Sequence, residues 1–126
     1  MNRGEFISEY QVFAKRALAL VNKARREGLL SLEDELESEK INAREIFEYG
    51  LSLVIDAIEP ELISKILSNI IAQDFDEYSR LLKTIQKEAA LLIQSGTNSR
   101  LLSMVLNSYT DLPLSEDKTE DGLELL

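Results

Sequence analysis

Hydrophobic residues recur every three or four positions along most of the chain, the spacing that places side chains on one face of an α-helix. The first such stretch covers about residues 5–27, and its apolar positions alternate in steps of four and three, as in a heptad seam. The seam consists of Phe6, Tyr10, Phe13, Ala17, Leu20 and Ala24. Arg25 and Arg26 precede Gly28, so basic charge and a glycine stop both mark the predicted helix end.

The same pattern predicts further helices along the chain. A short one is expected to begin at Ser31, where Asp34 three positions later completes a capping-box-like pair. A longer helix over about residues 43–58 is expected to break at Glu59-Pro60, because the residue before proline avoids the α region. The remaining predicted starts are Pro60, the acidic segment 74–77, and Asn98 or Ser99.

These elements predict an all-α fold, a bundle of five or six helices over residues 1–109. The last segment, residues 110–126, has a different composition: it contains Pro113 and six acidic residues against the single Lys118. We therefore expect it to be a disordered acidic tail. The N-terminal seam leaves two alternatives open, packing within the chain, which we favour, or pairing with a second copy in a homodimer.

Composition removes several classes of function. The 126 residues include no Cys and no His, which excludes disulfides, thiolate metal sites and His-dependent catalytic triads. A net charge of −9 and a pI of about 4.5 argue against a nucleic-acid partner. The apolar runs are far shorter than the ~20 residues of a membrane span. We expect a cytoplasmic protein with no membrane span, no cofactor and no metal.

The densest group of charged residues lies where the first two predicted helices meet, at residues 23–37. Basic residues end one helix and acidic residues fill the next. One interpretation is dipole compensation and a solvated acidic face. The other is a bipolar charged surface for a partner of opposite charge arrangement. The carboxylates crowd one short helix and suggest no opposed pair in a cleft, so we predict no enzyme. The candidate partner-binding residues are Arg25, Arg26, Glu33 and Glu37.

Two segments carry a resemblance to a known family. Residues 24–33 read Ala-Arg-Arg-Glu-Gly-Leu-Leu-Ser-Leu-Glu, and residues 50–63 include Gly-Leu, Leu-Val, an Asp, and then Glu-Pro-Glu-Leu-Ile. Both resemble the cytoplasmic region of MotA, the stator subunit of the bacterial flagellar motor. Ala57 stands where that family usually has glycine. The resemblance implies a MotA-cytoplasmic-like helical domain over residues 1–109.

The resemblance also implies a partner. In the family, one arginine and one glutamate of the first motif contact oppositely charged residues of the rotor switch protein, and these match Arg25 and Glu33 here. The chain lacks the family's membrane spans, so ion conduction is not implied. We therefore expect a flagellar-motor-associated module at the cytoplasmic face of the motor, which binds the rotor switch protein or another stator or motor component. The alternative is a general helical scaffold that oligomerises through the N-terminal seam.

Overall fold

The structure, a computed structural model, describes residues 1–36, 42 and 45–112. These residues form five α-helices and one 3-10 helix, and they include no strand. The elements are α1 (Arg3–Glu27), η1 (Leu29–Glu35), α2 (Ile46–Ile55), α3 (Pro60–Ile71), α4 (Glu77–Ser95) and α5 (Ser99–Asn107). The predicted all-α class is confirmed. Most of the predicted tail, residues 113–126, lies outside the described residues.

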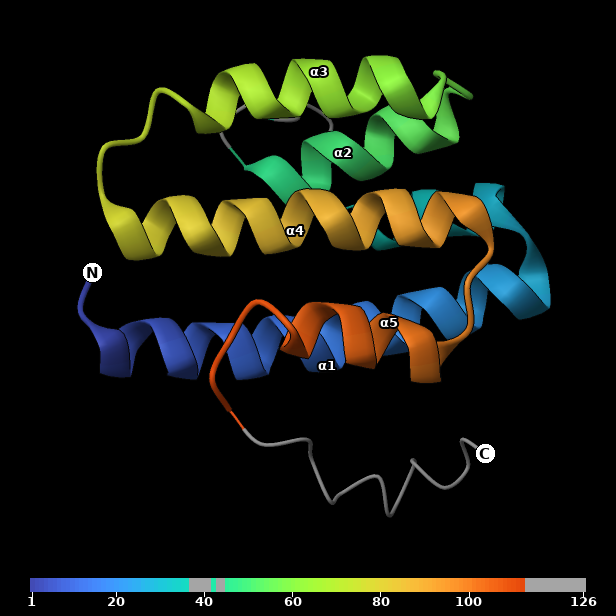
Figure 1. The fold of residues 1–126 in the computed structure, drawn as a ribbon. Helices are drawn as coiled ribbons and strands as arrows, with labels where there is room; N and C mark the ends of the chain where they lie inside the picture. Colours follow the sequence, from blue (N-terminus) through green and yellow to red (C-terminus); the bar gives the residue numbers. More distant parts are fainter. Residues whose placement is uncertain (37–41, 43–44, 113–126) are drawn as a thin grey trace.

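The helices lie in layers with their axes roughly aligned, and α4 runs through the middle (Figure 1). On one side of α4 lie α1 and α5, and on the other side lie α2 and α3. Two clusters of buried side chains fill the spaces between the layers. The larger joins α1, η1, α2, α4 and α5, and the smaller joins α2 to α3.

The helix boundaries follow local signals in the sequence. Asn2 caps α1 in a capping box with Glu5, and Pro60 occupies the first turn of α3. Asp76 accepts a hydrogen bond from the Ser79 backbone N–H at the start of α4, as the predicted acidic cap requires. The helix predicted over 43–58 is shorter, because α2 covers only Ile46–Ile55.

The N-terminal seam is used inside the molecule. Phe6, Tyr10 and Ala17 are buried in the larger cluster, and the Phe13 ring meets Phe47 edge-on with centroids 4.7 Å apart. This confirms packing within the chain. The surface through which the scaffold alternative would pair two chains is thus covered by the chain's own helices, and a homodimer through another face stays an untested prediction.

Gly50 lets α2 fit between its neighbours. A Cβ at this position would lie 3.1 Å from the Ala90 side chain on α4 and 3.1 Å from Leu67 on α3. Both distances are tighter than ordinary van der Waals contact. Because α2 carries buried residues on two sides, this close approach joins the two hydrophobic clusters into one stack of helices.

Candidate partner-binding surface

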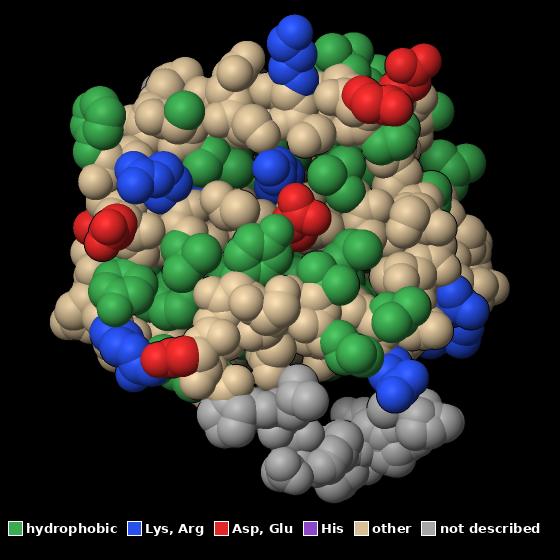
Figure 2. Space-filling view, viewed as in Figure 1, with side chains coloured by type: hydrophobic (Ala, Val, Ile, Leu, Met, Phe, Trp, Pro, Cys, Tyr) green, Lys and Arg blue, Asp and Glu red, His purple; other side chains and the backbone are tan. Residues whose placement is uncertain are grey.

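The predicted charged junction lies at one end of the molecule, where α1 stops and η1 begins. Gly28 forms the C-cap of α1 with φ of 93°, a conformation that favours glycine, and its N–H donates to the Ala24 carbonyl at 2.8 Å. Arg25 and Arg26 lie in the last turn of α1, and both side chains are exposed. Figure 2 shows basic side chains at the right-hand end of the molecule, where α4 leads into α5.

The acidic half of the junction has a different structure from the one predicted. The chain forms a 3-10 helix from Leu29 to Glu35, so the helix expected to begin at Ser31 starts two residues earlier. No side chain caps it, and the Ser31 hydroxyl donates to the Gly28 carbonyl at 2.7 Å. The predicted capping-box-like pair of Ser31 and Asp34 is therefore wrong.

The geometry of η1 sorts its residues into inward and outward rows. A 3-10 helix has about three residues per turn, so residues three apart line up along its axis. Leu29, Leu32 and Glu35 form the inward row: Leu32 is fully buried, and the other two are partly buried. Leu30 and Glu33 form an outward row, and both are exposed. This outward row thus carries one leucine and one carboxylate in register, and the neighbouring Asp34 is exposed as well.

One ion pair fixes η1 against α1, and a second joins α1 to α2. Lys23 pairs with Glu35 at 2.8 Å, and the hydrogen bond between them raises the pKa of Lys23 and lowers the pKa of the Glu35 carboxyl. Arg16 pairs with Glu48 on α2 at 3.1 Å and stacks over the Phe47 ring, 5.3 Å from its centroid. The bipolar surface is therefore built on an anchored helix.

The four predicted residues have different surroundings. The Arg25 guanidinium donates to the carbonyl oxygen of Gly96, the C-cap of α4, so it ties the end of α1 to the α4–α5 connection. Arg26 lies 3.7 Å from the neighbouring Glu27, and both are exposed. Glu33 is exposed, and its carboxylate has no hydrogen bond or ion pair to another described residue. Glu37 lies outside the described residues.

The sequence interpretation missed the residues that support this surface. Arg16 and Lys23 are seven positions apart on α1, and that spacing places them on the same side of the helix, facing η1 and α2. The signal was present in the sequence. Gly96 as the acceptor for Arg25 could not be found that way, because the two residues are 71 positions apart.

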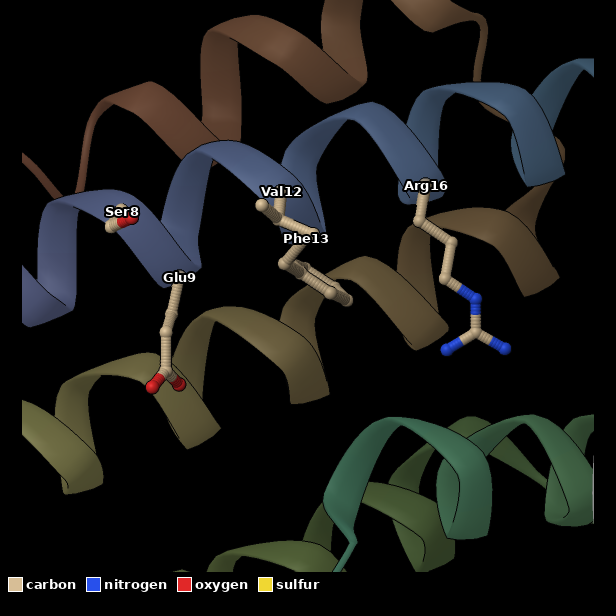
Figure 3. A pocket seen from close by; sticks show the side chains of 5 residues that line it. All are labelled: Ser8, Glu9, Val12, Phe13 and Arg16. Carbon is tan, nitrogen blue, oxygen red and sulfur yellow. The ribbon is translucent and has the colours of Figure 1, made fainter.

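A hollow lies along α1, lined by Ser8, Glu9, Val12, Phe13 and Arg16 (Figure 3). All five residues come from one helix, and Phe13 and Arg16 already make the contacts described above, so the hollow is an open depression between packed side chains. In the part of the chain that the structure describes, no group of three or more Asp and Glu residues is placed to hold a metal ion. The absence of an enzyme activity and of a cofactor stays a prediction.

Fold and surface together define a small all-α protein with a bipolar charged end. The chain is 38% identical over 96 residues to Motility protein A of Borreliella burgdorferi, covering 74% of this chain and 36% of that protein. It is 31% identical over 108 residues to Motility protein A of Treponema phagedenis, covering 86% of this chain and 39% of that protein. The predicted resemblance is confirmed: the chain is MotA-like, and it spans well under half the length of these curated relatives.

Other comparisons add nothing to this assignment. No family model matches the chain, and no solved structure matches it. Among the described residues, no helix combines the length and the apolar character needed to cross a membrane.

Proposed function

We propose that this MotA-like chain is an interaction module of the flagellar motor that binds the rotor switch protein, or another stator or motor component, through its bipolar charged end. Arg25 and Arg26 supply the positive side of this surface, and Glu33 supplies the negative side. Glu37 belongs to the proposal from the sequence alone. The proposal places the module at the cytoplasmic face of the motor.

The observation that supports this proposal most directly is the Glu33 carboxylate, which is exposed on an anchored helix and has no partner among the described residues. A carboxylate that stabilises its own fold has partners within the chain, as Glu35 and Glu48 do here. Glu33 has none among the described residues, and yet η1 holds it in a defined position. Such a charge suits an incoming basic residue, since complementary charges steer encounter and fix orientation.

The two arginines have separate roles in this proposal. Arg25 also donates to the Gly96 carbonyl, so its replacement disturbs the α4–α5 connection as well as the surface charge. Arg26 has only a loose contact with its neighbour Glu27 and stays free to meet an acidic partner. Glu33 and Arg26 are therefore the informative sites for mutation, and Arg25→Lys keeps the charge while altering the hydrogen bond.

The test is a binding titration between the purified protein and the torque-bearing domain of the flagellar rotor switch protein, repeated from low to high salt. We expect wild-type binding to weaken with salt, because ions screen exposed charges. Glu33→Lys should bind roughly tenfold more weakly at low salt, since it replaces an attraction with a repulsion. Arg26→Glu should have a similar effect.

A matched control is Glu9→Lys, an equal charge change on an exposed residue of α1. Glu9 lies sixteen residues before Arg25, about 24 Å along the helix. It should bind as wild type. Absence of wild-type binding at low salt would refute the proposed partner. Binding that Glu33→Lys and Arg26→Glu leave unchanged would refute the proposed surface.

The scaffold alternative has no observation in its favour, because the seam that it requires is buried. Phe13 is only 7% exposed, so Phe13→Glu would unfold the chain instead of separating two copies. Light scattering over a range of protein concentrations would still detect association through another face.

A further inference from the structure

Leu30 is an exposed leucine within the charged end of the molecule. Its exposure is 68%, whereas Leu29 is partly buried and Leu32 is fully buried. Over residues 23–36, Leu30 is the only large hydrophobic side chain classed as exposed. Because burying a leucine is favourable, a partner that covers Leu30 would gain free energy of binding.

The position of Leu30 is fixed by its neighbours on η1. Leu32 is buried in the larger cluster, and Glu35 is held by Lys23, so the inward row anchors the short helix at two points. Leu30 and Glu33 are three residues apart and lie on the outward row. A side chain presented on an anchored backbone loses little further freedom on binding, which favours affinity.

Charges alone explain orientation better than affinity. Exposed ion pairs contribute little net free energy, whereas the residues that dominate an interface are desolvated side chains at its centre with polar groups around them. Leu30 follows Arg26 by four residues and precedes Glu33 by three, so charges of both signs flank it in the chain. The other strongly exposed hydrophobic residues, such as Val12 and Phe75, lie on other elements.

We propose that Leu30 is the apolar anchor of this surface, inserting against an apolar side chain of the rotor switch protein that lies near an acidic residue meeting Arg26 and a basic residue meeting Glu33. This inference rests on the proposed function and deepens it. It states the chemistry of the partner surface: charges of both signs flanking a leucine-sized apolar contact.

The test uses the same rotor switch domain with Leu30→Ser, Leu30→Met and the control Val12→Ser. Val12 is 71% exposed on α1, so the control removes an equally exposed apolar side chain outside the junction. We expect Leu30→Ser to weaken binding about tenfold to hundredfold, Leu30→Met to restore most of it, and Val12→Ser to bind as wild type. All three should keep the wild-type unfolding midpoint, because their side chains are exposed.

The salt dependence of binding distinguishes the contribution of Leu30 from that of the charged residues. Apolar burial is not screened by ions, so Leu30→Ser should shift the plot of log Kd against log salt without changing its slope, whereas Glu33→Lys should change the slope. If wild type binds and Leu30→Ser binds equally well, the anchor is refuted and the charged surface stands. If wild type itself does not bind at low salt, the proposed function falls and the anchor falls with it.

Discussion

At the scale of single residues, Ala57 is a position where the residue type and the backbone conformation disagree. It has φ of 62°, and it is the one non-glycine residue with a positive φ in the described part of the chain. It lies in the turn between α2 and α3, at the position where the MotA resemblance expects glycine. Because a Cβ disfavours the left-handed region, the turn holds alanine there at a cost in stability.

Ala57→Gly should therefore stabilise the protein. We expect a gain of roughly 0.5–1 kcal/mol, the relief of left-handed strain less the extra freedom of glycine in the unfolded chain. Urea unfolding at neutral pH measures it. The matched control is Ala72→Gly at the end of α3, where φ is −63° and glycine relieves nothing. A midpoint for Ala57→Gly at or below that of wild type would contradict the strain.

At the scale of elements, η1 shows where local pattern and tertiary packing compete. Ser31 and Asp34 have the spacing of a helix start, and this suggested an α-helix from that point. The chain instead begins a 3-10 helix directly after Gly28, and Leu29 and Leu32, three residues apart on it, both pack in the larger cluster. A period of three over so few residues is weak evidence in a sequence. The ion pair of Glu35 with Lys23 also stabilises η1, and Lys23 belongs to another element, α1.

The helix α5 is short and has a side-chain cap at its start. α5 has nine residues, and helices of this length gain little from propagation alone. The Asn98 side chain accepts a hydrogen bond from the Leu101 backbone N–H at 2.8 Å. Asn98→Ala should cost about 1 kcal/mol in urea unfolding and speed hydrogen exchange at Leu101, whereas Asn98→Asp keeps the acceptor and should behave as wild type. Equal stability of the alanine and aspartate variants would show that the cap contributes nothing.

At the scale of the whole molecule, the order of helices and the composition of the core were predictable, because each helix carries its own apolar stripe and its own start or stop. The seam from Phe6 to Leu20 is buried as the spacing indicates. The arrangement of the charged end was not predictable. It depends on the contact of Arg25 with Gly96, two residues that are 71 positions apart. The close packing of Gly50 against Ala90 likewise joins segments far apart in the chain. Periodicity identifies which face is apolar, but it does not identify the neighbour that covers it.

Acid stability is a whole-molecule property that depends here on the connection between α3 and α4. Asp74 pairs with Lys83 at 2.8 Å and accepts hydrogen bonds from the Ser79 hydroxyl and the Asp76 N–H, and these contacts hold its pKa far below the ordinary value of 3.8. A carboxyl whose pKa is lowered in the folded state stabilises the fold at pH values above its unfolded pKa, near 4, and this contribution is lost as the pH falls further.

Asp74→Asn should therefore be less stable than wild type at pH 7 and pH 5, and the difference between their urea midpoints should narrow by pH 3. Lys83→Met keeps the Asp74 carboxyl and its hydrogen bonds from Ser79 and Asp76, so its difference from wild type should narrow less by pH 3 than that of Asp74→Asn. The relief of the net charge of −9 on acidification affects all three proteins almost equally and nearly cancels in the comparison. A difference that persists unchanged at pH 3 would mean that the Asp74 carboxylate does not stabilise this connection through its charge.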